Sequence, residues 1–222
     1  MSFSKRDLDR LASETNFIRD NLEKALRLCS ILEYFGENPL LLKSLALKGG
    51  TAINLMVFDL PRLSVDIDLD FAIPCNREEM LAMRAEINRE VITFMSTQGY
   101  TLGQETKNPH SLDSWIFHYR NVVNNKDNIK IEVNYSLRNH IFPLVMSSTS
   151  VNFLPMVTIQ VLSQVELCGS KIKALIERSA PRDLYDVHRM LTMKIFDEPD
   201  FVMLRKTVLF YLAVGGSKRL EE

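Results

Sequence analysis

The sequence lacks the features that would place it in several common protein classes. Its 222 residues contain three cysteines, an odd number at wide spacing, which argues against a disulfide framework and fits a reducing compartment. Neither a Cys-x-x-Cys pair nor a histidine cluster indicates a structural zinc site. No apolar run approaches the roughly 18 residues of a membrane helix, and the first residues lack the apolar core of a signal peptide. We therefore expect a cytoplasmic protein without a membrane segment.

The sequence also lacks a large excess of either charge. Lys and Arg total 27 against 28 Asp and Glu, so the formal net charge is −1. A contact with nucleic acid would therefore need a local basic patch. The hydrophobic content of 46% and the charged content of 25% are ordinary for a globular protein. This composition predicts one large domain or two lobes that share a core.

The most informative stretch lies between residues 47 and 70. A glycine pair, Gly49 and Gly50, follows a short apolar run and precedes a helix that we expect over 52–58. Glycines there can bring bare backbone N–H groups toward an anion at the N-terminus of a helix. Thr51 can donate its hydroxyl to a terminal phosphate, cap the helix, or do both. The pattern predicts a phosphate-binding turn.

A strand with alternating aspartates follows this turn. Asp66 and Asp68 lie on one face of it, roughly 6.5 Å apart along the strand, and apolar residues occupy the other face. Such a pair suits two divalent cations about 3.5–4 Å apart, because carboxylates without a cation repel each other. Asp70 continues the acidic face, but we expect it outside the metal site because it lies too far along the strand. Arg62 and Ser64, just before the strand, either hold a phosphate or brace the loop.

The flanking segments predict helices before the turn and a helix followed by a hairpin after the strand. Helical periodicity runs over 7–35, and Gly36 with Pro39 is expected to end that element. A capping box at Asn76 and Glu79 opens the next helix, which Gly99 closes. Residues 100–135 then alternate with period two, which predicts an antiparallel hairpin that joins the acidic strand in a mixed sheet.

The hairpin supplies a further acid, and a change of composition follows it. Glu132 lies on the polar face of the second hairpin strand, which makes it the candidate third metal ligand. The segment 143–155 is rich in Ser and Thr. We place a boundary there, between a core lobe over 1–150 and a C-terminal helical lobe over 151–222.

Two helices of the C-terminal lobe are expected to carry functional groups. Ser163 and Glu166 predict a capping box for a helix that runs to about residue 178. A second helix opens near residue 182, and we expect its apolar residues, Leu184, Val187 and Leu191, to face inward.

Charged residues of these two helices form a second candidate cluster. Lys171 and Arg178 share a helical face and can place two cations over a triphosphate. Asp183 lies in the first turn of the next helix, where an acid is usually a capping group. Asp186 is expected to pair with a nearby arginine, Arg182 or Arg189.

Two motifs in this order resemble a known family. The first reads Lys-Gly-Gly-Thr-Ala from Lys48, followed by Arg-x-Ser-x-Asp-Ile-Asp-Leu-Asp from Arg62. The second reads Lys-Ile-Lys-Ala-Leu from Lys171, followed by Arg-Asp-Leu-Tyr-Asp from Arg182. Together they resemble the AbiEii branch of the DNA polymerase beta-like nucleotidyltransferase superfamily, which holds the toxins of AbiE and MenT toxin–antitoxin systems.

The resemblance implies a fold, a reaction and a set of site residues. The fold would be α+β, with a mixed, twisted sheet flanked by helices and a C-terminal helical lobe that contributes Lys and Asp to the active site. The reaction would be Mg²⁺-dependent transfer of a nucleoside monophosphate from an NTP, with two Mg²⁺ ions. The metal ligands would be Asp66, Asp68 and Glu132, although the superfamily usually has Asp in the third position. Lys171 would contact the phosphates and Asp183 would be a further catalytic acid. The residues expected to bind the nucleotide are Gly49, Gly50, Thr51, Arg62, Ser64, Lys171 and Arg178.

The resemblance also implies partners. The expected acceptor is the 3′ end of tRNA, and the expected protein partner is a cognate antitoxin. A tRNA acceptor predicts a basic face, for which the candidates are Lys126, Lys130, Arg138, Lys171, Lys173, Arg178 and Arg182. The alternatives are a protein AMP-transferase, a non-catalytic member that binds RNA or a partner, and a metal-dependent nuclease. The Gly-Gly-Thr turn favours a triphosphate over a nuclease reaction.

Overall fold

The computed structural model describes residues 4–58, 60–149 and 151–215 and divides the chain into two compact units. The first, which we call the sheet unit, comprises Met1–His140 and Met146–Val161. The second, the helical unit, comprises Ile141–Val145 and Leu162–Glu222. Residues 151–161, which the sequence analysis placed in the C-terminal lobe, thus belong to the sheet unit. Within the described residues, no helix is both long and apolar enough to cross a membrane.

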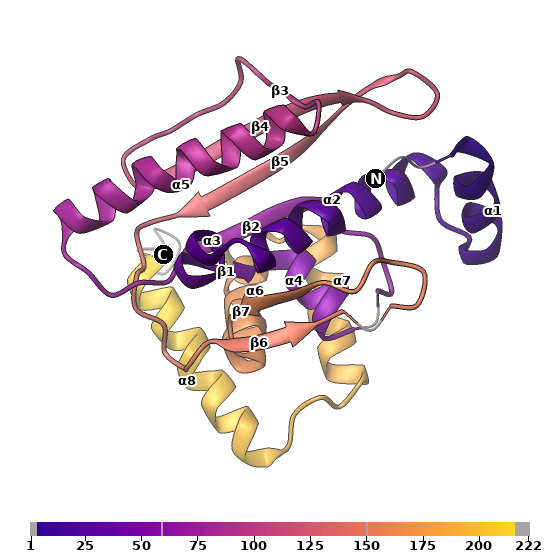
Figure 1. The fold of residues 1–222 in the computed structure, drawn as a ribbon. Coiled ribbons are helices and arrows are strands. Elements are labelled where there is room, and N and C mark those ends of the chain that lie inside the picture. The colour runs from indigo at the N-terminus through magenta and orange to yellow at the C-terminus, as the bar shows by residue number, and fades with distance from the viewer. Residues whose placement is uncertain (1–3, 59, 150, 216–222) are drawn as a thin grey trace. The chain divides into compact units, whose positions relative to one another are not determined.

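A mixed sheet of seven strands, in the order β3-β4-β5-β2-β1-β7-β6, is formed by the described residues (Figure 1). The strands are β1 (Leu45–Lys48), β2 (Asp66–Phe71), β3 (Thr101–Leu102), β4 (Leu112–Arg120), β5 (Lys126–Asn134), β6 (Val145–Ser148) and β7 (Thr158–Val161). The acidic strand β2 pairs antiparallel with β1 and parallel with β5, and β4 and β5 form an antiparallel hairpin. The predicted mixed sheet, with a hairpin beside the acidic strand, is confirmed.

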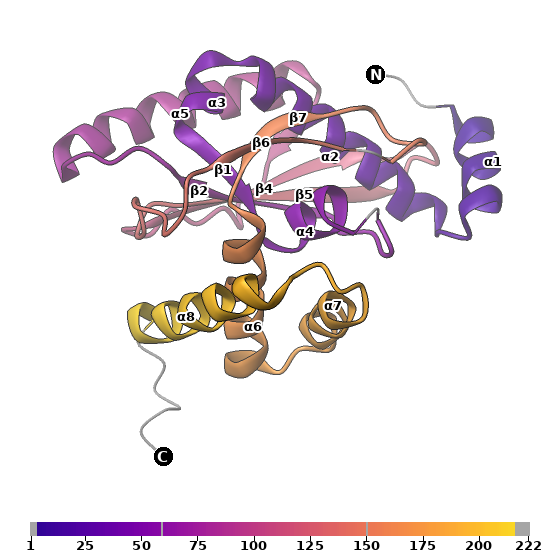
Figure 2. The same ribbon diagram turned by 90° about the horizontal axis from the view of Figure 1, so that it is seen from below.

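The alternation of apolar and polar residues separates the two faces of this sheet. Ile67, Leu69 and Phe71 of β2 are fully buried, as are the alternate residues of β5. This face packs against α2 (Arg19–Glu37) and α5 (Arg77–Thr97), which Figure 2 shows on the same side of the sheet. The aspartates of β2 therefore lie on the opposite face, as the period-two pattern predicts.

The N-terminal helices differ in one detail from the expectation. The predicted helical stretch forms α1 (Lys5–Thr15) and α2, and Gly36 lies inside the last turn of α2 rather than ending it. Pro39 begins a short helix of its own, α3 (Pro39–Ser44). The reason for glycine at position 36 is packing, because a Cβ there would lie 2.2 Å from the carbonyl oxygen of Thr158.

The two helices that follow β1 and β2 begin at well-defined signals. Helix α4 (Gly49–Met56) starts three residues earlier than expected, so that both glycines belong to its first turn. Helix α5 begins at the predicted capping box, in which Asn76 accepts from the backbone N–H of Glu79 and the Glu79 carboxylate accepts in return. Gly99, just past its end, has a left-handed φ of +81°, which suits glycine.

The helical unit contains α6 (Gln164–Arg178), α7 (Pro181–Thr192) and α8 (Glu198–Gly215). Ser163 caps α6 by accepting from the backbone N–H of Glu166. The expected capping box is only half formed, because the buried Glu166 carboxylate accepts instead from the Ile141 backbone and the Tyr211 hydroxyl. Glu166 thus ties three segments of this unit together.

The orientation of α7 contradicts the expectation. Leu184 and Leu191, expected to face inward, are each 59% exposed. The residues that α7 buries are Asp183, Asp186 and Met190. The prediction was wrong because it followed apolarity alone, whereas cationic side chains of α6 hold the two aspartates of α7 inside the unit.

Candidate active site

A row of charged residues, which we call the acidic row, crosses the polar face of the sheet. It consists of Lys48 of β1, Asp66, Asp68 and Asp70 of β2, and Lys130 and Glu132 of β5. Lys48 on β1 lies opposite Asp68 on β2, and Asp68 lies opposite Glu132 on β5. Residues in register on neighbouring strands lie side by side, because such strands are about 4.7–4.9 Å apart. The structure therefore brings Glu132 beside Asp68, in the neighbourhood that the sequence analysis assigned to it.

The neutralisation of these acids is uneven. The ammonium of Lys48 forms an ion pair with Asp70, and Lys130 Nζ lies 2.9 Å from Glu132 Oε2. The carboxylates of Asp66 and Asp68 make no ion pair or side-chain hydrogen bond with any other residue that the structure describes. Two adjacent carboxylates are therefore left without a directly bound cation.

The electrostatics of Asp68 reflect this shortage of positive charge. Burial raises the pKa of the Asp68 carboxyl above its ordinary value, and the nearby acids Glu132 and Asp66 raise it further. Lys48 and Lys130 lower it, but they do not cancel the increase. A carboxyl in such surroundings is stabilised in its charged form by an additional cation.

Gly49 fits closely against this carboxylate. Its φ of +72° lies in the left-handed region that favours glycine, and a Cβ at this position would lie 2.3 Å from Asp68 Oδ2. The first turn of α4 and the Asp68 carboxylate therefore touch only because residue 49 has no side chain. Gly49 is thus more than a flexible turn residue, since it lets the N-terminus of α4 lie directly beside Asp68.

Thr51 has a structural role in this arrangement. The residue is fully buried, and its hydroxyl donates to the carbonyl oxygen of Asp66, which fastens α4 to the start of β2. It does not cap α4, because Lys48 occupies the N-cap position. Arg62 and Ser64 lie partly exposed in the connection between α4 and β2.

The donor chemistry of the row fits a hard divalent cation. Asp66, Asp68 and Glu132 offer only oxygen ligands, which Mg²⁺ prefers. In the described part of the chain, no three or more His, Cys, Asp or Glu side chains already converge on one point. Since Lys130 engages Glu132, that glutamate would exchange the ammonium for the metal in order to bind it.

The helical unit contains a second, densely paired cluster. Lys171 Nζ lies 3.0 Å from Asp183 Oδ1 and 3.2 Å from Asp186 Oδ2. Arg178 Nε lies 2.6 Å from Asp183 Oδ2. Lys171, Asp183 and Arg178, all predicted site residues, thus lie together within this unit.

The two aspartates of α7 make contacts with α6. Asp183, for which capping was the alternative to a catalytic role, does not cap the helix, because Ala180 occupies the N-cap of α7 and no side chain caps it. Asp186 pairs with Lys171 of α6. Burial raises the pKa of the Asp183 carboxyl, but hydrogen bonds from Arg178 and Lys171 outweigh this effect, and the pKa is lowered overall.

The candidate basic residues are largely occupied. Besides Lys171 and Arg178, Lys130 pairs with Glu132, and Lys173 Nζ lies 2.7 Å from Glu177 Oε2. Four of the seven candidates for nucleic-acid contact are therefore bound to carboxylates. The remaining three are Lys126, Arg138 and Arg182.

Sequence reasoning missed the roles of Lys48 and Asp186. Both contribute through ion pairs whose partners depend on strand register or on helix packing. The presence of Lys48 directly before the glycine pair was a usable signal, since the register of β1 against β2 then places it opposite Asp68.

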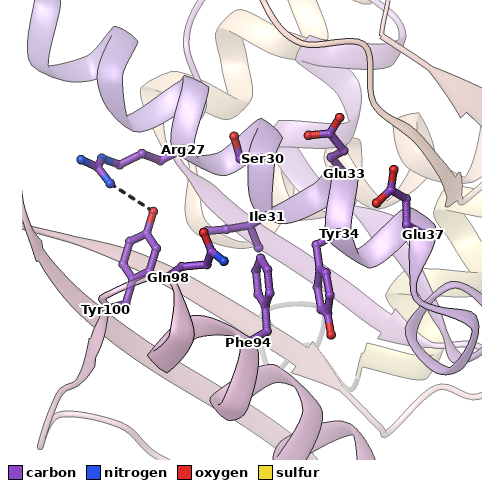
Figure 3. Close-up of a pocket in the computed structure, with 9 residues that line it drawn as sticks. All are labelled: Arg27, Ser30, Ile31, Glu33, Tyr34, Glu37, Phe94, Gln98 and Tyr100. Atoms are coloured by element: carbon purple, nitrogen blue, oxygen red, sulfur yellow. Dashed lines mark hydrogen bonds between the residues drawn. The ribbon is translucent and has the colours of Figure 1, made fainter. Parts of the chain in front are cut away.

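A cavity of about 200 Å³ lies elsewhere in the sheet unit, between α2 and α5 (Figure 3). The rings of Tyr34 and Phe94 stack at its wall with centroids 3.7 Å apart, and Arg27 donates to the Tyr100 hydroxyl over 3.5 Å. None of the predicted site residues lines it. The cavity therefore does not belong to the acidic row.

Comparisons with known proteins agree with the motifs. Residues 31–220 match the family model described as nucleotidyl transferase AbiEii toxin of type IV toxin–antitoxin systems. No curated protein matches the chain.

Two solved structures share the fold. MenT4, a nucleotidyltransferase toxin from Mycobacterium tuberculosis, aligns with a TM-score of 0.67 at 19% identity, over 93% of this chain and 69% of its own. A candidate nucleotidyltransferase from H. pylori aligns with a TM-score of 0.56 at 17% identity, over 89% of this chain and 83% of its own. Since the family model covers most of the chain, the protein belongs to the AbiEii family of nucleotidyl transferase toxins of type IV toxin–antitoxin systems.

Proposed function

We propose that this nucleotidyltransferase uses Mg²⁺ to transfer a nucleoside monophosphate from an NTP to the 3′ end of tRNA. The observation that carries the proposal is the pair Asp66 and Asp68, whose carboxylates have no ion-pair partner among the described residues, and of which Asp68 lies against Gly49. Acids that need a cation, next to backbone N–H groups suited to phosphate, are the two elements that a metal-bound triphosphate requires.

The acidic row would hold the metal. Asp66 and Asp68 would hold the metal, and Glu132 would contribute a further oxygen ligand after releasing Lys130. Bound divalent ions supply activation of the acceptor hydroxyl and charge compensation on the departing pyrophosphate.

Each unit separately offers groups that would bind a phosphate. Gly49 and Gly50 present the N-terminal N–H groups of α4, where the helix dipole favours an anion. Arg178 is the more accessible cation of the second cluster, because its side chain is 64% exposed. Lys171 is 7% exposed, so it would contact a phosphate only by giving up one of its two aspartates.

A basic pair on the hairpin supports a nucleic-acid acceptor. Arg120 and Lys126 face each other directly across β4 and β5. Like charges in this position repel, and a phosphate between them would relieve the repulsion. Exchange of both residues for Gln would weaken acceptor binding and leave NTP binding intact.

The proposal is tested by label transfer. The protein is incubated with Mg²⁺ and each of the four α-labelled NTPs, together with either total RNA or a protein extract. We expect label in the tRNA band, and none with the Asp66→Ala variant, whose fold is checked by circular dichroism. Label in protein would favour the AMP-transferase alternative, and shortened RNA without NTP would favour a nuclease. An Asp66→Ala variant as active as the parent protein would refute the mechanism.

Membership of the family also implies an antitoxin. We propose that expression of this chain arrests growth and that co-expression of a neighbouring gene relieves the arrest. The Asp66→Ala chain is the control, since it should be harmless with or without that gene.

A further inference from the structure

The ion pair between Lys48 and Asp70 does not follow the strand register. The register partner of Lys48 is Asp68, whereas Asp70 lies opposite Ala46. Lys48 therefore reaches diagonally past its direct neighbour. A diagonal neighbour is about 7–8 Å away between Cα atoms, which a lysine side chain can span.

Two features favour the diagonal contact. Ala46, the register partner of Asp70, has only a methyl side chain, which offers the Asp70 carboxylate neither a charge nor a hydrogen bond. Asp70 is itself only 3% exposed, so its charge gains from an ammonium at close range.

The consequence concerns Asp68. If Lys48 paired with its register partner, the ammonium would occupy the carboxylate that the proposed function assigns to Mg²⁺. With Lys48 held by Asp70 and Lys130 held by Glu132, Asp66 and Asp68 keep no direct partner among the described residues. The two cations closest to the site are thus kept off the two acids that are proposed to bind metal.

We propose that Asp70 is a positioning residue that holds Lys48 away from Asp68 and thereby keeps Asp68 open to a divalent cation. The inference rests on the proposed function, since it assigns Asp68 to the metal. Asp70 itself is not a ligand in this scheme.

The test is Mg²⁺ binding to the full chain, measured by titration calorimetry without NTP. In Asp70→Asn, Lys48 is released and pairs with Asp68. An exposed or half-buried ion pair is worth about 1 kcal/mol, so Mg²⁺ affinity should fall by about five- to tenfold. Lys48→Met alone should bind Mg²⁺ at least as tightly as the wild type, because a competing charge is removed.

The double variant Lys48→Met/Asp70→Asn shows whether a loss of Mg²⁺ affinity in Asp70→Asn comes from the released Lys48 or from the loss of Asp70 itself. It should recover wild-type affinity within about twofold, because the competing ammonium is gone. If Asp70 were a metal ligand or a purely structural residue, the loss would persist in the double variant, and the inference would be overturned. The double variant is also compared with Lys48→Met, which keeps the test decisive if Asp70→Asn does not fold. Equal Mg²⁺ affinities of these two variants support the inference, and a weaker affinity in the double variant overturns it.

The two proposals fail in different ways. A wild-type chain that binds no Mg²⁺ would overturn the metal site of the proposed function. A wild-type chain that binds Mg²⁺, with an unchanged affinity in Asp70→Asn, would overturn only the role of Asp70.

Discussion

The acidic row of the sheet unit and the α6–α7 cluster of the helical unit arrange similar residues in opposite ways. In the row, the cations bind the outer acids, and Asp68 is left with a raised pKa. In the cluster, Asp183 receives both Lys171 and Arg178, and its pKa is lowered. One aspartate is deprived of positive charge and the other is surrounded by it.

This difference in electrostatics indicates that the two aspartates have different roles. A buried carboxylate with two hydrogen-bonded cations stabilises its surroundings, because its charged form is preferred in the folded state. A carboxylate whose charge is disfavoured costs stability, and such strain is typical of a site that awaits a ligand. We therefore expect the cluster to govern stability and the row to govern activity.

The largest effect should come from breaking the cluster. In Asp183→Asn, two cations lose a buried anionic partner, and we expect a loss of about 3 kcal/mol in the free energy of unfolding. The matched control is Glu177→Gln, which breaks the more exposed pair with Lys173 and should cost less than about 1 kcal/mol. Urea unfolding of both variants measures the difference. Equal losses would show that the buried ion pairs of Asp183 contribute no more to the free energy of unfolding than the more exposed pair does.

The next prediction separates the contact of residue 49 with Asp68 from the backbone strain of a positive φ. Gly49→Ala and Gly99→Ala both place alanine at a positive φ, but only at position 49 would the new Cβ meet Asp68, since nothing lies within 4 Å of a Cβ at Gly99. Both should lose about 1–2 kcal/mol of stability. Only Gly49→Ala should also lose nucleotidyl transfer, by about 10²-fold, because it displaces a metal ligand. Retained transfer in Gly49→Ala would argue against the role of the turn.

The smallest effect is the pH dependence of stability, which should have opposite signs in the two regions. Because the folded-state pKa of Asp183 is lowered, its stabilisation is present above the pKa of the unfolded chain and is lost as the pH falls through the folded-state value. Because the folded-state pKa of Asp68 is raised, stability is lost as the pH rises through that value. Unfolding between about pH 2 and pH 7 should therefore show a weaker acid loss in Asp183→Asn and a weaker loss with rising pH in Asp68→Asn. Parallel curves for the two variants would contradict the assignment.

The sequence predicted the local parts of this structure well. The acidic strand, the hairpin beside it and the capping box of α5 follow from period-two alternation and from short-range hydrogen bonding, which neighbouring residues determine. Asp66, Asp68 and the glycine pair could be selected for the same reason.

The remaining features depend on partners that are distant in sequence. The ion pair of Lys48 with Asp70 depends on the register of β1 against β2, which cannot be read from a local sequence pattern. Helix α7 buries Asp183 and Asp186 and exposes Leu184 and Leu191, the opposite of what apolarity predicts. The ion pairs of the aspartates with Lys171 and Arg178 of α6 outweigh the gain from burying the two leucines. Gly36 was misread as a helix end, since its contact with Thr158 joins elements far apart in the chain.

Thermal or urea unfolding of the wild type and Asp68→Asn, with and without Mg²⁺, tests most directly whether Asp68 binds the metal. Without metal, Asp68→Asn should be the more stable by about 1 kcal/mol, because a disfavoured charge is removed. With Mg²⁺ at about 100 times its dissociation constant, the wild type should gain about 2.7 kcal/mol and become the more stable of the two. An equal gain from Mg²⁺ in both proteins would contradict the claim that Asp68 binds the metal.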